Sequence, residues 1–242
     1  MSERIAKRMA RAGVGSRREA ERWITDGRVA LDGVPVTTPA TLVEASQKIT
    51  LDGEPIPEPQ AAVLVRFHKP KGLITARRDP EGRPTIYDRL APEFGALMPI
   101  GRLDLNSEGL LLLTNDGGLK RHIELPSTGW RRRYRVRVYG RVQLETLKPL
   151  SDGITVDGVR FGPIEARIEQ QKGANGWLEV GLREGKNREV RKAMEHIGLQ
   201  VNRLIRTAYG PFQLGSLKVG QAAVVPAKVM REQLGKGVVD GL

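Results

Sequence analysis

The sequence predicts an α+β protein in two parts, in which a small N-terminal domain precedes a larger domain built mainly on an antiparallel sheet. Two observations support this fold class. Before residue 57, helical periodicity is followed by two segments that each contain an Asp-Gly turn, whereas the rest of the chain holds many alternating or apolar runs and few helices. The length of 242 residues is ample for burying a core.

Two helices are expected near the N-terminus. Ile5 and Met9 recur at helical spacing, and Gly13 follows as a suitable helix end. Ser16 then begins a second helix, with Glu19 three residues later. This spacing predicts a capping box, in which each of the two side chains satisfies a backbone N–H of the other residue.

A small sheet is expected to complete this first domain. Segments 29–36 and 49–56 each place Asp-Gly between short alternating runs, which predicts two β-hairpins. We therefore assign residues 1–56 to one domain. Residues 57–61 contain two prolines and no periodicity, and are expected to form a semi-rigid linker.

The second domain is expected over residues 62–230, with residues 231–242 as a C-terminal tail. Its clearest helix covers residues 188–197, where apolar side chains recur at helical spacing behind Asn187 as a candidate cap. Strands are expected at four segments: 62–67, 110–114, 134–140 and 177–182.

The charge of the chain indicates a polyanionic partner. Lys and Arg number 40 against 28 Asp and Glu, which gives a net charge of +12. Nucleic acid is the first candidate for a protein this basic. Aromatic residues make up only 5% of the chain, so structured RNA, recognised by its shape and phosphates, is favoured over single strands held by base stacking.

The composition also excludes several kinds of site. The chain has no cysteine, which excludes thiol catalysis, disulfides and iron–sulfur clusters. Its three histidines lie far apart and in no metal-ligand spacing, so we expect no metal site. Apolar runs such as Leu110–Leu113 are far too short to cross a bilayer, and the charged N-terminus does not resemble a signal peptide. We expect a monomeric cytoplasmic protein that does not bind a membrane.

An arginine-rich strand is a candidate for the RNA-binding surface. Residues 130–141 contain six arginines and no acidic residue. Alternation along the strand places Tyr134 on the buried face and Arg135 on the outer face. We interpret Arg133 and Arg135 as RNA contacts; the alternative is an ordinary solvated strand face.

A second group of candidate RNA contacts lies in the first domain, at Lys7, Arg17 and Arg18. The two arginines come just inside a helix N-terminus, where the helix dipole disfavours cations. A functional requirement such as phosphate binding would explain why they are there.

The segment PIGRLDLNSEGLLLLTNDG, residues 99–117, carries the candidate chemistry. Gly101 is expected to allow a close backbone approach, and Arg102 and Asp104 project to one side if the chain is extended there. A carboxylate on a loop that leads into the buried strand 110–114 is well placed for catalysis. The alternative is that Asp104 caps a turn and pairs with Arg102.

GRLDLNSEGLLLLTND within this segment closely resembles the signature of the RsuA/RluB-type ribosomal RNA pseudouridine synthases. Residues 3–56 resemble the S4 RNA-binding domain that this family carries at its N-terminus. The DPEGRPTIYD run and the NREVRKAME helix are most similar to the large-subunit branch of the family. The remaining family blocks occur in the expected order, at residues 68–90, 132–140 and 183–211.

The resemblance implies a role for four residues. Asp104 matches the catalytic aspartate, Tyr134 the active-site tyrosine and Arg191 the basic residue that pairs with the aspartate. Arg102 matches an arginine that helps hold the place of the flipped nucleotide in the RNA. From the residues alone, Tyr134 could instead be a core aromatic and Arg191 an exposed helix arginine.

The implied activity is the isomerisation of a uridine in ribosomal RNA, with the 23S RNA or a large-subunit precursor as partner. The reaction breaks the N1–C1′ bond, turns the uracil and rejoins it through C5, so it needs no cofactor or metal. A carboxylate can act in it only when ionised, and a nearby arginine favours that form. The target base must leave its stack, which costs a few kcal/mol that an aromatic ring and an arginine can offset. A non-catalytic ribosome-assembly factor on the same scaffold is the main alternative.

Overall fold

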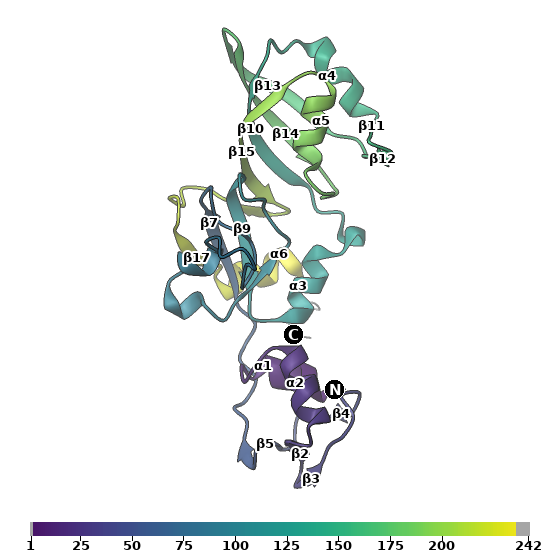
Figure 1. Ribbon diagram of the computed structural model, residues 1–242, viewed down its shortest axis with the longest axis vertical. Helices are drawn as coiled ribbons and strands as arrows, with labels where there is room; N and C mark the ends of the chain where they lie inside the picture. The colour runs from purple at the N-terminus through teal and green to yellow at the C-terminus, as the bar shows by residue number, and fades with distance from the viewer. Residues whose placement is uncertain (1, 236–242) are drawn as a thin grey trace. The chain divides into compact units, whose positions relative to one another are not determined.

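The computed structural model describes residues 2–235, which divide into two compact units (Figure 1). The first unit extends to Ala62 and includes Asn115–Gly117; the second contains Val63–Thr114 and the chain from Gly118 onward. The proposed linker, residues 57–61, contains no helix or strand and falls in the first unit.

The first unit packs two helices against short strands. The helices are α1 (Ile5–Arg11) and α2 (Arg17–Thr25), and Ser16 and Glu19 form the predicted capping box at the start of α2. Buried Ile5, Met9 and Ile24 form the centre of its core. Its strands are β1 (Glu3–Arg4), paired with β4 (Leu42–Val43), and a four-stranded sheet in the order β3 (Val34–Pro35), β2 (Val29–Leu31), β5 (Ile49–Leu51) and β6 (Glu54–Pro55).

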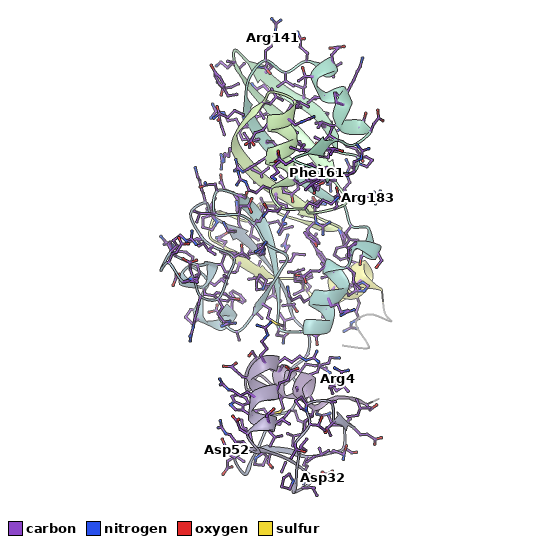
Figure 2. The ribbon with its side chains drawn as sticks, turned by 45° about the vertical axis from the view of Figure 1, so that its right-hand side comes forward. Arg4, Asp32, Asp52, Arg141, Phe161 and Arg183 are labelled. Carbon is purple, nitrogen blue, oxygen red and sulfur yellow. The ribbon has the colours of Figure 1, made fainter. Side chains whose placement is uncertain are left out.

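Both predicted hairpins of the first unit are confirmed. Strands β2 and β3 pair around Asp32-Gly33, and strands β5 and β6 pair around Asp52-Gly53. All four turn residues have positive φ, between 50° and 86°, as a two-residue turn of the I′ type requires. Figure 2 shows the two turns, marked by Asp32 and Asp52, at the same end of the unit.

The second unit is built on a nine-stranded sheet, which confirms the predicted mainly antiparallel architecture. Only β9 and β15 pair in parallel among its described strands. The order along the sheet is β13 (Glu165–Lys172), β14 (Asn175–Leu182), β10 (Arg132–Tyr139), β15 (Gln200–Tyr209), β9 (Glu108–Thr114), β7 (Leu64–Lys69) and β17 (Ala222–Val224), with β16 (Phe212–Gln213) on β15 and β8 (Met98–Ile100) on β9.

Helices cover this sheet (Figure 1). The α-helices are α3 (Gly117–Glu124), α4 (Leu144–Ser151), α5 (Glu189–His196) and α6 (Ala227–Leu234); the other elements are the 3-10 turns η1 (Ile86–Asp88), η2 (Pro92–Phe94) and η3 (Pro126–Thr128), and the hairpin of β11 (Thr155–Val156) and β12 (Val159–Arg160). Strand β9 is buried on both faces. Leu110 and Leu112 belong to one apolar cluster and Leu111 and Leu113 to another, so the strand is a rigid support for the loop that precedes it.

Three local expectations are corrected. Strand β9 begins at Glu108, two residues earlier than predicted, because its first residues pair with β15. Helix α5 begins behind Arg188, which has a left-handed conformation, and not behind an Asn187 cap. Helix α6 continues into the expected tail as far as Leu234, which is buried together with Met230. The rest of that tail, residues 236–242, lies outside the described residues.

Two glycines of the signature segment have different physical requirements. Gly101 has a positive φ of 65°, but a Cβ atom there would meet open space, so the expected close backbone approach is not observed at this position. The close approach occurs at Gly109, where φ is 102° and a Cβ atom would lie 2.3 Å from the carbonyl oxygen of Arg206. Only glycine therefore allows β9 and β15 to pair there.

Gly109→Ala is expected to lower the free energy of unfolding by about 3 kcal/mol, because it adds a backbone overlap to an unfavourable φ. Gly101→Ala is the matched control and should cost about 1 kcal/mol, since it has unfavourable φ without overlap. Urea denaturation of both variants measures the difference. Equal destabilisation would contradict this interpretation of the β9–β15 contact.

Candidate active site

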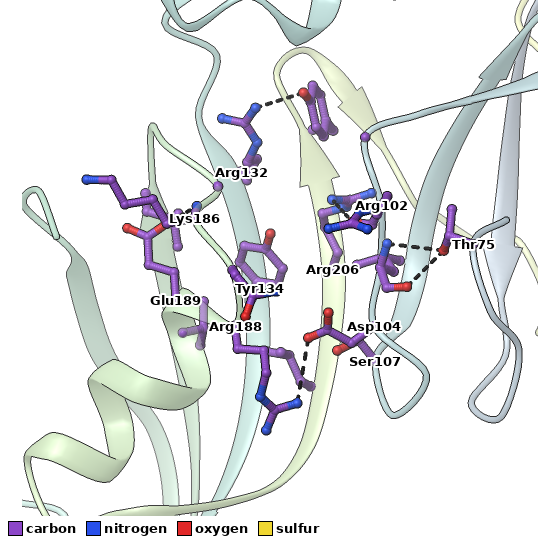
Figure 3. Close-up of a pocket in the computed structure, with 18 of the residues that line it drawn as sticks. Thr75, Arg102, Asp104, Ser107, Arg132, Tyr134, Lys186, Arg188, Glu189 and Arg206 are labelled. Carbon is purple, nitrogen blue, oxygen red and sulfur yellow. Dashed lines mark hydrogen bonds and ion pairs between the residues drawn. The ribbon is translucent and has the colours of Figure 1, made fainter. Parts of the chain in front are cut away.

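A cavity of about 540 Å³ opens in the second unit, within the size range of ligand-binding pockets (Figure 3). Its walls come from the loop between β8 and β9, from β10, from β15 and from the loop between β14 and α5. Charged and polar groups dominate the lining: Arg102, Asp104, Ser107, Lys120, Glu124, Arg132, Tyr134, Lys186, Arg188, Glu189 and Arg206.

Asp104 lies on the loop before β9, and the backbone on both sides of it is held by hydrogen bonds. The Ser107 amide donates to the Asp104 carbonyl at 3.0 Å. The Thr75 hydroxyl donates to the Leu103 carbonyl at 2.8 Å and accepts from the Leu103 amide at 3.2 Å. The carboxylate itself is 36% exposed and faces the cavity, so a fixed loop presents it to a ligand (Figure 3).

Lys69 ties the same loop to β7. The side chain is fully buried, and its ammonium donates to the carbonyls of Pro70, Asp104 and Ser107 at 3.0, 3.2 and 3.0 Å. Burial lowers the pKa of Lys69 to about 8, while attraction to the carboxylates of Asp104 and Glu108 raises it. Three carbonyl acceptors compensate the ammonium for the water that it loses.

The expected ion pair between Arg191 and Asp104 is not observed. Arg191 is buried and donates to the backbone carbonyls of Asn106, at 2.7 Å, and Val201, at 3.1 Å. It is therefore not an exposed helix arginine either. Among the described residues, the cation closest to the carboxylate is Arg188, whose Nη1 lies 3.9 Å from Oδ2 of Asp104. Arg191 holds the Asp104 loop through its backbone, and burial lowers the pKa of its guanidinium.

The predicted neighbours Arg102 and Tyr134 both line the cavity (Figure 3). Tyr134, on β10, is only 8% exposed and packs in the apolar core of the second unit. It is therefore both a core aromatic and part of the cavity wall. Arg102 is exposed, and no ion pair joins it to Asp104 in the described part of the chain. Arg102 and Asp104, which lie two residues apart in the signature segment, therefore both line the cavity without forming an ion pair with each other.

Besides Arg188, two further arginines of the cavity were missed in the sequence analysis. Arg132 donates from Nη2 to the Tyr209 hydroxyl at 2.8 Å, with its guanidinium 4.6 Å from the centre of that ring. Arg206 is buried and donates to the Leu110 carbonyl at 2.8 Å. Strand alternation could have placed Arg132 in the site, because residues two apart on a strand share a face and Tyr134 was already a candidate. Nothing local marks Arg206, which is brought into place by the pairing of β15 with β9.

The arginine-rich strand β10 is less cationic than its sequence indicates. Arg135 donates to Glu169 at 2.6 Å and lies 4.3 Å from the ring centre of Trp177, while Arg131 pairs with Glu165. Both carboxylates belong to β13, so acidic residues of another strand balance the charge of these arginines. The sequence favoured RNA binding by Arg135 because no acidic residue lies near it along the chain. In the structure, Glu169 balances its charge. Arg133 is half-buried and is not part of the cavity lining.

The other predicted RNA contacts lie in the first unit. Lys7 is 3.4 Å from Glu3, and Arg17 is 3.1 Å from Glu21 one helical turn away. Arg18 is exposed on α2 beside Arg17. These side chains belong to the first unit, whereas the residues that line the cavity all belong to the second unit.

Between residues 2 and 235, no helix has both the length and the apolar character needed to span a membrane. Over the same residues, no cluster of three or more His, Cys, Asp or Glu side chains is arranged to hold a metal ion.

Comparison with known proteins agrees with both units. Residues 63–196 match the family model for RNA pseudouridylate synthase, and residues 3–49 match that of the S4 domain. A Rickettsia prowazekii protein named an uncharacterized RNA pseudouridine synthase is 43% identical over 231 residues, which cover 96% of this chain and 97% of the relative. A crystal structure of a pseudouridylate synthase superposes with a TM-score of 0.65 at 25% identity, covering 96% of this chain and 99% of the other.

Relatives with a more specific name are similar to a comparable degree. The ribosomal large subunit pseudouridine synthase B of Yersinia pestis is 42% identical over 224 residues, which cover 88% of this chain and 69% of that protein. The protein of the same name from Salmonella typhi is 42% identical over 221 residues, covering 88% and 76%. With its S4 domain, its catalytic-domain match and relatives of this identity along nearly the whole length, the chain belongs to the RNA pseudouridylate synthase family.

Proposed function

We propose that this chain converts a uridine of large-subunit ribosomal RNA to pseudouridine, with Asp104 as the catalytic carboxylate and without a cofactor. The single observation that carries the proposal is the placement of Asp104: a carboxylate facing a cationic cavity, on a loop fixed by Lys69 and Arg191. The large-subunit substrate is supported by the 42% identity to proteins named for that activity.

The chemistry requires little beyond these residues. Pseudouridine is an isomer of uridine: the N1–C1′ bond breaks, a C5–C1′ bond forms, C5 loses its hydrogen to water and N1 takes up a proton, so the reaction needs no group donor, oxidant or reductant. Breaking the N1–C1′ bond requires a group that attacks the nucleotide or removes a proton from it, and an ionised carboxylate can do either. Arg188, at 3.9 Å from the Asp104 carboxylate, stabilises its negative charge.

The nucleotide must also be held outside its helix. We assign this task to Tyr134, whose ring forms part of the cavity wall, and to Arg102, which is exposed and can enter the place that the base leaves. The cations Arg132 and Arg206 give the cavity wall a positive charge suited to RNA phosphates. In the first unit, Lys7, Arg17 and Arg18 are proposed to contact the RNA backbone.

Asp104→Asn is expected to reduce turnover by roughly 10²- to 10⁴-fold or more, because an amide can neither attack nor accept the proton as a carboxylate does. RNA transcribed with uridine tritiated at C5 measures turnover directly, since bond formation at C5 expels that hydrogen. Asp157→Asn, an exposed aspartate that pairs with Lys192, is the matched control and should keep wild-type turnover. Near-wild-type activity of Asp104→Asn would refute its assignment.

Replacing Arg17 and Arg18 by Ala is expected to weaken RNA binding and to make its dependence on salt shallower. Loss of two phosphate contacts should reduce the log–log salt slope by roughly 1 to 2. The double variant Arg135→Ala with Arg167→Ala is the control: it removes the same charge from two arginines of the second unit, which pair with Glu169 and Glu179. Binding isotherms at several salt concentrations that show equal effects for both double variants would contradict the assignment.

A further inference from the structure

Two carboxyl groups, those of Glu184 and Glu189, are both bound by Lys186 beside the cavity, where β14 leads into α5. Glu189 is the first residue of α5, is only 3% exposed and lines the cavity. Its Oε2 accepts a hydrogen bond from the Lys186 amide at 2.9 Å. Its Oε1 is shielded from solvent and receives no hydrogen bond from an N–H or hydroxyl of the described residues. The Glu184 carboxyl is near enough to exchange a hydrogen bond with Glu189 when one of the two is protonated.

Glu184 is better compensated than its partner. Its Oε1 accepts from the Gly162 amide at 2.6 Å, and its Oε2 lies 2.7 Å from the Lys186 ammonium. Burial raises the pKa of Glu184, but the hydrogen bonds from Lys186, Glu189 and Gly162 together outweigh it and leave that pKa below its ordinary value. Glu184 therefore remains ionised near neutral pH.

Glu189 takes the proton of the pair. Burial, followed by the effect of Glu184, raises the pKa of Glu189 to about 8, although the bond from the Lys186 amide lowers it. A neutral Glu189 can donate its proton to Glu184, which a second carboxylate could not do. The other charged groups that face this pair are Lys186 itself, Arg188 and the Arg132 side chain beside Gly185.

These contacts fix the whole loop. Besides pairing with Glu184, the Lys186 ammonium donates to the Arg160 carbonyl at 2.5 Å, so the loop is tied to the segment around Gly162. The chain then passes through Arg188, whose φ of 52° is unusual for a residue with a side chain. This conformation places the Arg188 guanidinium 3.9 Å from Asp104.

We propose that the proton shared between Glu189 and Glu184 holds this loop closed and thereby positions Arg188 against the Asp104 carboxylate. Glu189 is then a positioning residue for the isomerisation, an inference that rests on the proposed function. Loss of the proton leaves two adjacent carboxylates that repel each other, so the loop opens and Arg188 moves away from Asp104.

The test is the pH profile of turnover between pH 6.5 and pH 9 for the full-length wild type and Glu189→Gln. Wild-type turnover should fall about tenfold per pH unit once the pH exceeds the Glu189 pKa of about 8. The Gln amide can donate to Glu184 and its carbonyl can accept from Lys186, so Glu189→Gln should keep turnover at pH 7 within about threefold and lose this fall. Glu189→Ala should lose at least about tenfold at every pH, because it lacks both groups.

One control variant and one rival titrating group decide how the profiles are interpreted. Glu145→Gln, an exposed glutamate on α4, should reproduce the wild-type profile. Lys69 also has a pKa of about 8, so its deprotonation would produce an alkaline fall that survives in Glu189→Gln. A profile of Glu189→Gln that falls at the same pH as the wild type would therefore overturn the proposal.

A second readout does not depend on activity. Carbon NMR of protein labelled at glutamate carboxyls should show a resonance that titrates near pH 8 in the wild type and is missing in Glu189→Gln. Because the folded-state pKa lies above the ordinary 4.5, the stability from this group is full below pH 4.5 and is lost as the pH rises through about 8. If this resonance is present but the wild type turns over no uridine, the carboxyl pair stands and the proposed function fails. Wild-type turnover without this resonance would overturn the inference alone.

Discussion

The site depends on buried cations that hold backbone carbonyls. Lys69 and Arg191 both donate hydrogen bonds to the loop that carries Asp104. Lys69 donates to the carbonyls of Asp104 and Ser107, and Arg191 donates to that of Asn106. A backbone held in this way has few alternative conformations, because release of any of these carbonyls would leave a buried cation with one acceptor fewer. The Asp104 carboxylate, which we propose as the reacting group, is thereby positioned through its backbone and faces the cavity.

The sheet supplies the frame for these contacts. Strand β9 is buried on both faces and pairs in parallel with β15 at Gly109, so the end of the Asp104 loop cannot shift relative to β15. The same pairing brings Arg206 to the cavity wall. On the paired strand β10, Arg132 and Tyr134 also line the cavity, and Arg188 comes from the loop before α5, where the Glu189 carboxylate accepts from the Lys186 amide. Cations from three elements therefore line the cavity that the Asp104 carboxylate faces, an arrangement suited to an anionic RNA substrate.

Features set by neighbouring residues could be predicted from the sequence. The capping box of Ser16 and Glu19 and the two Asp-Gly hairpins depend on contacts within a few residues, and the structure contains all of them. The main strands and the cavity position of Asp104 also follow from local pattern and motif.

Features set by strand pairing could not be predicted. The acidic partners of Arg131 and Arg135 lie 34 residues further along the chain, on a strand whose register no local pattern specifies. A local backbone conformation was also not predictable. Arg188, and not Arg191, is the neighbour of Asp104, and this depends on the left-handed conformation of Arg188 at the start of α5. The Glu184–Glu189 pair is close in sequence, but its shared proton follows from burial, which only the folded chain reveals.

The most direct test of the account is the pseudouridine content of ribosomal RNA after incubation with the purified protein. Large-subunit RNA, both as a free transcript and within precursor particles, and small-subunit RNA would be digested to nucleosides and separated by chromatography. The account predicts that pseudouridine accumulates in the large-subunit RNA and not in the small-subunit RNA. Failure to form it in either large-subunit substrate would contradict the account and favour a non-catalytic role in ribosome assembly.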